Sequence, residues 1–200
     1  MSTLKILHLS DIHCSTSRLL EVLKLARDYN LVAVSGDIEC IEAVEILAKA
    51  SIPTVAITGN MDSRTVAEEL EKRGILLDGR VVEKTGLKIA GIGGLDPRGD
   101  LEKLVESRAE RIDILVTHQP PHGTVDRTFL GIRAGSREIK NYVLQTKPLV
   151  NLCGHIHESR GTTSLGETLV VNPGPLRKGY YAEILVELAG RKAQAVLRRL

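Results

Sequence analysis

The sequence predicts an α/β fold that begins with parallel strands and ends with antiparallel ones. Short apolar runs alternate with helix-like segments over the first third of the chain, which is the pattern of parallel βαβ units. A hairpin pattern follows, and the last third is rich in strand-like runs. The chain has 200 residues and shows no linker, repeat or low-complexity tract. We therefore expect one domain, residues 1–200.

In the parallel part, three apolar runs are typical of strands buried on both faces. They are residues 4–9, 31–34 and 54–57. Apolar side chains also recur at helical spacing, which predicts three helices between and after these strands. The helices are expected at residues 19–26, 43–50 and 66–74.

In the second part, residues 81–84 and 87–92 flank Thr85-Gly86 and predict an antiparallel hairpin. Helices are expected near 100–111 and 136–146. The segment 118–135 between them is long for a structureless loop and is a candidate functional loop. The remaining strands are predicted at 113–116, 149–152, 168–171, 180–187 and 193–197.

Composition excludes several classes of protein. Apolar residues make up 42% and charged residues 26%, as in an ordinary globular protein, and the net charge is only +2. This charge does not favour electrostatic capture of DNA or membrane, and the scarcity of aromatics disfavours single-stranded nucleic acid. No apolar run is long enough for a membrane span, and the N-terminus does not resemble a signal peptide. We expect a cytoplasmic protein. The sequence leaves the oligomeric state open, a homodimer included.

Side chains that can bind metals follow five of the predicted strands. In open α/β sheets, ligands bind at the carboxyl ends of the strands, so residues scattered in the sequence are expected to meet there. Each residue alone has an ordinary alternative, such as a helix cap for Asp11 or a turn for Asn60. The coincidence at five strand ends favours a shared site. The candidates are Asp11, His13, Asp37, Asn60, His118, His155 and His157.

Local spacing supports the same interpretation. In an extended segment, alternate side chains point the same way, so Asp11 and His13 are expected to converge, as are His155 and His157. A glycine precedes Asp37, Asn60 and His155, and glycine allows the backbone to approach a metal or phosphate closely.

These motifs resemble those of the calcineurin-like metallophosphoesterase superfamily. The shared pattern is Asp-x-His, Gly-Asp, Gly-Asn-x-Asp, a single His and Gly-His-x-His, and it extends from Leu7 to His157. The resemblance implies a four-layer α-β-β-α sandwich of two mixed β-sheets flanked by helices. Among family members, the small stand-alone prokaryotic phosphodiesterases are most similar, because their loops match His118-Gln-Pro-Pro121 and Gly154–Glu158.

The resemblance also implies two divalent metal ions. The first would be bound by Asp11, His13 and His157, and the second by Asn60, His118 and His155, with Asp37 bridging both. Oxygen and imidazole ligands without thiolate suit Mn²⁺, Fe, Co, Ni or Zn²⁺. The expected reaction is hydrolysis of a phosphodiester by in-line attack of a metal-bridging hydroxide, with Asp37, Asn60 and His118 activating the water and positioning the phosphate.

One position departs from the family pattern. Many members carry His at the position of Met61, where it is thought to protonate the leaving oxygen. Met has no proton to give, so we expect either a leaving group that needs little acid or another donor, for which His122 is the candidate. Arginines in the loops 96–99 and 127–137 are candidate phosphate contacts.

Two other functions are compatible with these motifs or with this fold. A phosphomonoesterase or nucleotidase would use the same metals, and an interaction scaffold would use only the fold, as the retromer's phosphoesterase-fold subunit does. The substrate is expected to be a small phosphoester or nucleotide. A Ser/Thr phosphatase is disfavoured because Gly36-Asp37-Ile-Glu39 lacks the usual Asp-Arg-Gly extension, and a Mre11-like nuclease is disfavoured by chain length and charge.

The three cysteines are expected to be unpaired. Cys14, Cys40 and Cys153 are odd in number and lack CxxC spacing, so a disulfide framework is not predicted. Cys14 follows His13 and should point away from the metals, and both Cys14 and Cys153 are interpreted as packing residues.

Overall fold

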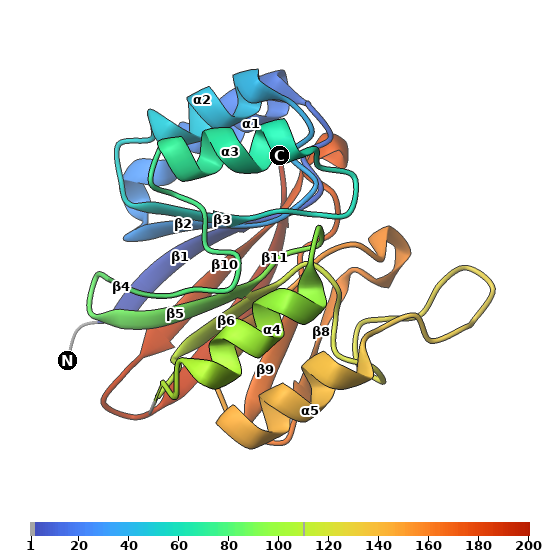
Figure 1. Ribbon diagram of the computed structural model, residues 1–200. Helices are drawn as coiled ribbons and strands as arrows, with labels where there is room; N and C mark the ends of the chain where they lie inside the picture. The colour runs from blue at the N-terminus through green and yellow to red at the C-terminus, as the bar shows by residue number, and fades with distance from the viewer. Residues whose placement is uncertain (1–2, 110) are drawn as a thin grey trace.

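The central strands are apolar throughout because each face of a strand packs against a different core. In β2 (Leu31–Ser35), Ala33 faces the core between the two sheets, whereas Val32 and Val34 face a second core under helices. The same alternation in the other sheet places Ile114 in the inter-sheet core and Leu115 under helices. The resulting computed structural model, which describes residues 3–109 and 111–200, confirms the predicted α-β-β-α sandwich of two mixed sheets (Figure 1).

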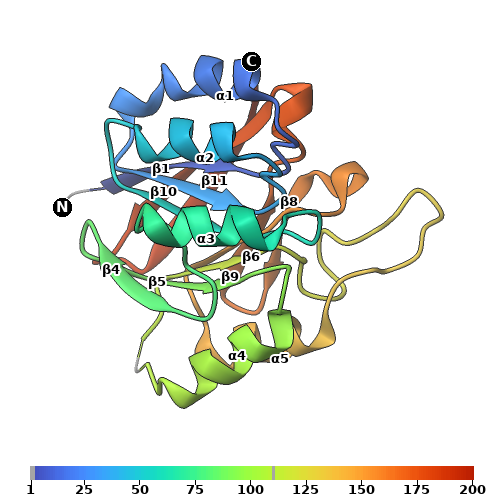
Figure 2. The same ribbon diagram turned by 45° about the horizontal axis from the view of Figure 1, so that its top comes forward.

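The first sheet has the strand order β11-β10-β1-β2-β3. Strands β1, β2 and β3 are parallel, and β10 pairs antiparallel with β1 and with β11. Three helices, α1 (Thr16–Leu23), α2 (Ile41–Ala48) and α3 (Arg64–Lys72), cover its outer face (Figure 2). The remaining strand bounds are β1 (Thr3–Leu9), β3 (Thr54–Ile57), β10 (Tyr180–Glu187) and β11 (Lys192–Arg199).

The second sheet has the strand order β4-β5-β6-β7-β9-β8. Its inner four strands are parallel, and each edge strand pairs antiparallel with its neighbour. Helices α4 (Pro97–Glu106) and α5 (Arg137–Thr146) cover its outer face. Its strands are β4 (Val81–Lys84), β5 (Leu87–Ile92), β6 (Ile114–Thr117), β7 (Val150–Leu152), β8 (Gly161–Leu165) and β9 (Thr168–Asn172).

Most predicted elements are confirmed within a few residues, with two differences. Strand β8 and three short 3₁₀ helices, η1 (Ala26–Asp28), η2 (His157–Ser159) and η3 (Leu176–Lys178), were not predicted. Helix α4 begins earlier than expected because Asp96 caps it, accepting the Gly99 N–H, and Pro97 occupies its first turn. It also ends at Glu106, short of the expected Arg111, and Glu110 lies outside the described residues. Among the described residues, no helix is long and apolar enough to cross a membrane.

Asp78 forms hydrogen bonds to Thr58 where the chain passes from the first sheet to the second. Its carboxylate accepts the Thr58 N–H at 3.0 Å and the Thr58 hydroxyl at 2.5 Å. Burial raises the pKa of Asp78 to about 6, and the nearby Asp100 carboxylate adds to this effect. Since Thr58 immediately precedes Gly59-Asn60, this contact also positions one of the predicted site segments.

We expect the free energy of unfolding of Asp78→Asn, measured relative to that of wild type, to be larger at pH 7.5 than at pH 4.5. Because the folded-state pKa lies above the unfolded value, the native carboxylate costs free energy once it is ionised, and this cost is absent below about pH 4. A shift from 3.8 to about 6 corresponds to about 2–3 kcal/mol. Urea unfolding at the two pH values measures the difference between variant and wild type. A difference that does not change with pH would contradict the expected ionisation.

Candidate metal centre

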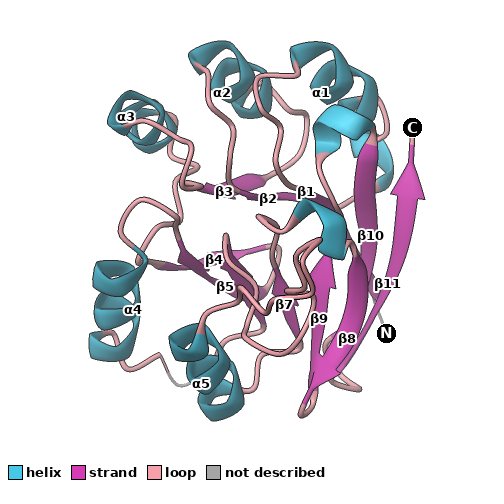
Figure 3. Cartoon of the chain, turned by 90° about the vertical axis from the view of Figure 1, so that its right-hand side faces the viewer, coloured by secondary structure: helices cyan, strands magenta, loops and turns pink. Residues whose placement is uncertain are grey.

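The seven predicted ligand residues meet between the two sheets, at the carboxyl ends of their parallel strands. Asp11 and His13 follow β1, Asp37 follows β2, and Asn60 follows β3 in the first sheet. His118 follows β6, and His155 and His157 follow β7 in the second sheet. Figure 3 looks onto this edge, where the loops from both sheets come together. We call these seven residues the ligand cluster.

Three members of the ligand cluster surround one point. Asp11, His13 and His157 each offer a ligand atom, and these atoms lie within 4.8 Å of one another. The Nε2 atoms of His13 and His157 are 3.2 Å apart, and His157 Nε2 is 3.1 Å from Asp11 Oδ1. Two imidazole nitrogens and a carboxylate oxygen that face one point form an arrangement able to hold a divalent cation.

The other members form an adjoining group. Asp11, Asp37 and His118 also present ligand atoms within 4.8 Å of one another. His118 Nε2 lies 2.8 Å from the Asn60 side-chain oxygen and 3.5 Å from Asp37 Oδ1. The His155 ring is 4.9 Å from the His118 ring, centroid to centroid. Asp11 belongs to both groups, so two cation positions would lie next to each other.

Hydrogen bonds outside the ligand cluster fix the orientation of two of its histidine rings. His13 Nδ1 is 2.7 Å from a Glu39 carboxylate oxygen, and His118 Nδ1 is 2.8 Å from the Ser35 carbonyl. When Nδ1 carries the proton and donates it to these acceptors, Nε2 is left with its lone pair directed into the cluster, as metal-binding histidines require. Sequence reasoning did not identify Glu39 in this role.

The ligand loops have an unusual backbone conformation. Asp11, His13, Asp37 and His155 all have φ between +47° and +67°, a region that non-glycine residues adopt uncommonly. Asp11 and His13 converge as predicted, but the prediction that an extended backbone brings them together is wrong. The β1–α1 and β2–α2 loops instead run side by side, since Asp11 N–H donates to Gly36 O and His13 N–H to Asp37 O. His155 and His157, which were also expected to converge, face different groups, because His155 lies beside His118 and His157 lies beside His13 and Asp11.

Two glycines allow the ligand carboxylates to approach the backbone. A Cβ on Gly59 would overlap Asp37 Oδ1, and a Cβ on Gly154 would overlap the Ser10 hydroxyl, which donates to Asp11. The donor set contains carboxylate, amide and imidazole groups and no thiolate, which suits divalent first-row transition metals. These residues fit a metal centre in both shape and chemistry.

The surroundings shift the pKa values of two members of the ligand cluster, Asp11 and His155. Although burial opposes it, the hydrogen bonds from His157 and Ser10 and the nearby His118 hold the pKa of Asp11 below its usual value. Burial and the adjacent His118 ring lower the pKa of His155. A charged carboxylate and a neutral imidazole are the forms that coordinate cations.

The cleft over the ligand cluster has a volume of about 470 Å³ and is open to solvent. Met61, whose side chain is 61% exposed, lies at its rim, and its N–H donates to Asp37 Oδ1 at 2.9 Å. Arg177, from η3, lines the opposite part of the cleft, with Nη2 3.4 Å from His157 Nδ1. Sequence reasoning did not select Arg177, because η3 has no motif that marks it.

Asp62 has a role that the sequence did not indicate. Asp62 is the last residue of the Gly-Asn-x-Asp motif and directly follows Met61. Its oxygens accept three backbone N–H groups, from Gly59 at 2.7 Å, Ile38 at 2.8 Å and Glu39 at 2.6 Å. Asp62 thereby joins the loop that carries Asp37 to the loop that carries Asn60.

Other candidate residues lie outside the cleft. His122 belongs to the turn after Pro121, its N–H donates to Ser136 O, and it does not line the cleft. Arg98 is on α4 and pairs with Glu102.

Cys153 is buried and unpaired, as predicted. Asn172 supports the last ligand segment from behind by donating to Ile156 O.

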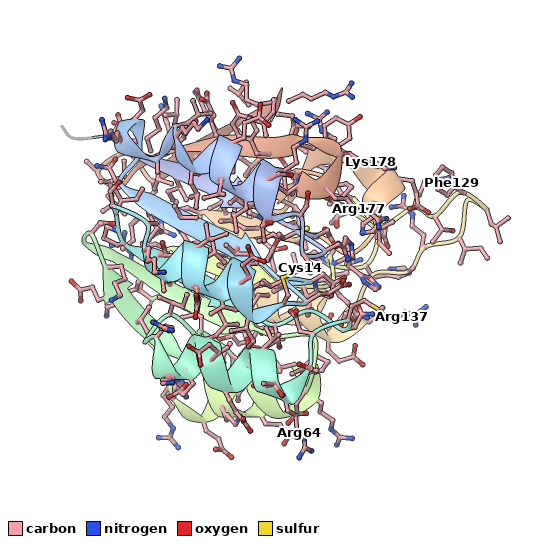
Figure 4. All side chains as sticks on the ribbon, turned by 90° about the horizontal axis from the view of Figure 1, so that it is seen from above. Cys14, Arg64, Phe129, Arg137, Arg177 and Lys178 are labelled. Atoms are coloured by element: carbon pink, nitrogen blue, oxygen red, sulfur yellow. A yellow bond between two sulfur atoms is a disulfide. The ribbon has the colours of Figure 1, made fainter. Side chains whose placement is uncertain are left out.

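The expectation that the cysteines are unpaired is wrong for two of them. Cys14 and Cys40 form a disulfide, with Cα atoms 5.4 Å apart (Figure 4). The sequence showed no spacing signal because the pairing is made by the fold: Cys14 N–H donates to Ile38 O, which aligns the two loops. Cys14 therefore points away from the cluster, but it joins two ligand loops and does not pack in a core.

We expect loss of this disulfide to lower the free energy of unfolding by about 3 kcal/mol, because it closes a loop of 26 residues in the unfolded chain. Urea unfolding with and without dithiothreitol should show the loss in wild type and no further loss in Cys14→Ala/Cys40→Ala. Cys153→Ala should keep the dithiothreitol sensitivity. An unfolding midpoint for wild type that does not respond to dithiothreitol would contradict the bond's contribution.

Comparisons with known proteins agree with this geometry. The family model of the calcineurin-like phosphoesterase superfamily domain matches residues 4–185. An uncharacterized protein of Methanocaldococcus jannaschii is 29% identical over 202 aligned positions, which cover 89% of this chain and 90% of that protein.

Two solved structures illustrate the similarity of fold. The protein TT1561 of Thermus thermophilus has a TM-score of 0.73 at 21% identity, with 98% of this chain and 99% of that chain covered. An archaeal phosphodiesterase has a TM-score of 0.55 at 18% identity, with 97% and 99% covered. At these identities the structures show the fold alone, whereas the family model spans most of the sequence. The chain belongs to the calcineurin-like phosphoesterase superfamily.

Proposed function

We propose that the protein is a metal-dependent phosphodiesterase that acts on a small phosphoester or nucleotide. The observation that carries this proposal is the convergence of all seven ligand-type side chains at the base of one open cleft. A scaffold would not need to keep every ligand position filled, nor to hold four of them in a strained backbone conformation.

The motifs that the chain shares with its family suggest how the ligand cluster would be divided between two cations. Asp11, His13 and His157 would hold one cation. Asn60, His118 and His155 would hold the other, with Asp37 between them. When bound, two divalent cations lower the pKa of water and withdraw charge from phosphoryl oxygens. Mn²⁺, Fe, Co, Ni and Zn²⁺ all suit this donor set.

The protein's own residues orient the substrate and limit its chemistry. Arg177 can donate to the non-reacting phosphate oxygens, and the open cleft leaves room for a substituent on each side of a diester. Met61 occupies the rim without a proton to give. We therefore expect good leaving groups, such as phenolates, to be preferred. His122 remains the candidate proton donor for other esters, although reaching the cleft would require its turn to move.

Metal reconstitution tests the proposed function. Metal-free protein loaded with Mn²⁺, Ni²⁺ or Zn²⁺ is assayed on bis-p-nitrophenyl phosphate and on p-nitrophenyl phosphate. We expect faster turnover of the diester with at least one metal. Faster turnover of the monoester would indicate a phosphomonoesterase or nucleotidase. Metal binding without hydrolysis of either ester would leave the scaffold as the better interpretation.

We expect Arg177→Ala to raise KM for the aryl diester by about 10–100-fold while kcat changes less, because a charge-assisted hydrogen bond to the phosphate is lost. Arg177→Lys should recover part of the affinity, since a point charge replaces a bidentate donor. Lys178→Ala, at the neighbouring exposed position, is the matched control. A KM for Arg177→Ala equal to that of the control would show that Arg177 does not contact the substrate.

A further inference from the structure

A hairpin of residues 126–134 projects from the protein (Figure 1), and the side chains at its tip are apolar and exposed. Phe129, Leu130 and Ile132 are 88%, 85% and 60% exposed, and Phe129 is the chain's single phenylalanine. We call these three residues the apolar tip. The turn is closed by Thr128, whose N–H donates to Ile132 O at 3.0 Å and whose carbonyl accepts from Gly131 N–H at 2.8 Å.

The base of the hairpin is firmly held. The Asp126 carboxylate is fully buried, pairs with Arg133 at 2.6 Å, and accepts N–H groups from Gly123 at 2.9 Å and Gly135 at 3.2 Å. Arg127 and Arg133 form an antiparallel bridge above it. The exposed tip is therefore presented by a defined structure.

The hairpin is also attached to the ligand cluster. Arg127 N–H donates to the Ser159 hydroxyl at 3.1 Å, and Phe129 N–H donates to the Glu158 carboxylate at 2.9 Å. Both acceptors directly follow His157 in η2. The apolar tip and the cleft consequently belong to the same side of the molecule.

Cationic side chains share this side. Figure 4 shows Arg137, Arg177 and Lys178 at the end of the molecule from which Phe129 projects. Together with Arg127 they form what we call the basic collar, and none of the four has an ion pair within the part of the chain that the structure describes. Of the nearby acids, Asp126 is paired with a cation, Arg133, whereas Glu158 and Glu138 accept hydrogen bonds from neutral donors, the Phe129 N–H and the Ser136 hydroxyl. The four cations of the collar therefore outnumber the two acids that no cation balances.

We propose that the apolar tip and the basic collar dock the protein on an anionic lipid surface, with the cleft near the headgroups. Apolar side chains that enter the acyl boundary, beside cations that face anionic headgroups, are the combination that binds such surfaces. The overall charge of +2 does not attract a membrane, but this local arrangement concentrates cations around the tip. The inference does not depend on catalytic activity.

The size and shape of the tip favour lipid over a protein partner. Three largely exposed side chains offer on the order of 400 Å² of surface, about half of what one partner buries in a stable protein interface. The tip is convex, so a protein partner would need a matching pocket, whereas a lipid surface adapts to it.

A single-tryptophan variant tests the docking directly, because the chain contains no tryptophan. In Phe129→Trp, phosphatidylglycerol vesicles should shift the tryptophan fluorescence to shorter wavelengths. Brominated lipids in the vesicles should quench this fluorescence. Pure phosphatidylcholine vesicles should have much less effect. Val105→Trp is the control, since Val105 is also exposed but lies near the end of α4 that points away from the cleft. Equal responses at the two positions, or none at either, would overturn the proposal.

Vesicle co-sedimentation of the full chain gives the affinity. Phe129→Ser/Leu130→Ser and Arg137→Glu/Lys178→Glu should each weaken binding to phosphatidylglycerol vesicles by at least about tenfold, and added salt should weaken wild-type binding. Phe129→Ser/Leu130→Ser should hydrolyse the soluble aryl diester as wild type does. If the wild type does not sediment with the vesicles, or if it self-associates without lipid and Phe129→Ser/Leu130→Ser abolishes this, the tip serves a purpose other than lipid binding.

Discussion

Replacing Asp37 by Asn is expected to reduce diester hydrolysis by about 10²–10³-fold or more and to lower the number of bound metal ions. Asp37 is buried, lies 3.5 Å from His118 Nε2 through its Oδ1 atom, and is proposed to contact both cations. Asn keeps the side-chain volume and can still accept the Met61 N–H. It removes the negative charge that would hold two dications close together, so the loss should come from the metal centre and not from the fold.

A second buried aspartate provides the control. Asp113 accepts the Lys88 N–H and pairs with Arg111. It immediately precedes β6, at the end of the sheet opposite the ligand cluster. Asp113→Asn should retain both metal content and activity per folded molecule. Elemental analysis, thermal unfolding and the aryl diester assay separate the two variants. If Asp37→Asn keeps full activity with two metal ions, the proposed centre is wrong.

Local sequence signals predicted most of the fold, and the differences have physical causes. The β4–β5 hairpin agrees residue for residue because its turn, Thr85-Gly86, and both of its strands lie within twelve consecutive residues. Strand β8 was not predicted because Gly161-Thr-Thr-Ser-Leu165 has no apolar run. It is an edge strand that pairs with β9, and none of its five residues is buried, so its conformation depends on that pairing. The sequence pattern alone cannot supply such a pairing.

The ligand cluster was predictable because each ligand directly follows a recognisable strand. The residues that orient these side chains could not be predicted in the same way. Glu39 has no signature until His13 is known to lie beside it, and the Cys14–Cys40 disulfide depends on the same alignment of two loops. Arg177 reaches the cleft from η3, far along the chain. Such contacts arise only when the two sheets are packed together.

Asp62→Ala is expected to lower the free energy of unfolding by about 3 kcal/mol, because three buried backbone N–H groups would lose a shared charged acceptor. Burial raises the pKa of Asp62 in spite of these amides, so the ionised carboxylate also carries a cost and the net loss is smaller than three separate bonds would give. The loops that carry Asp37 and Asn60 should loosen as well, which we expect to weaken metal binding by about 10–100-fold.

The neighbouring Ser63 makes a matched comparison. Its hydroxyl caps α3 by accepting a single N–H, from Val66, at 3.3 Å, so Ser63→Ala should cost only about 1 kcal/mol and leave metal affinity unchanged. The free energy of unfolding of Asp62→Asn should be closer to that of Asp62→Ala than to that of wild type. The NH₂ group of the asparagine would face backbone N–H groups, which are donors as well. Urea unfolding of metal-free protein and metal titration distinguish these effects. If Asp62→Ala costs no more than Ser63→Ala and binds metal normally, the two ligand loops hold their positions without this carboxylate.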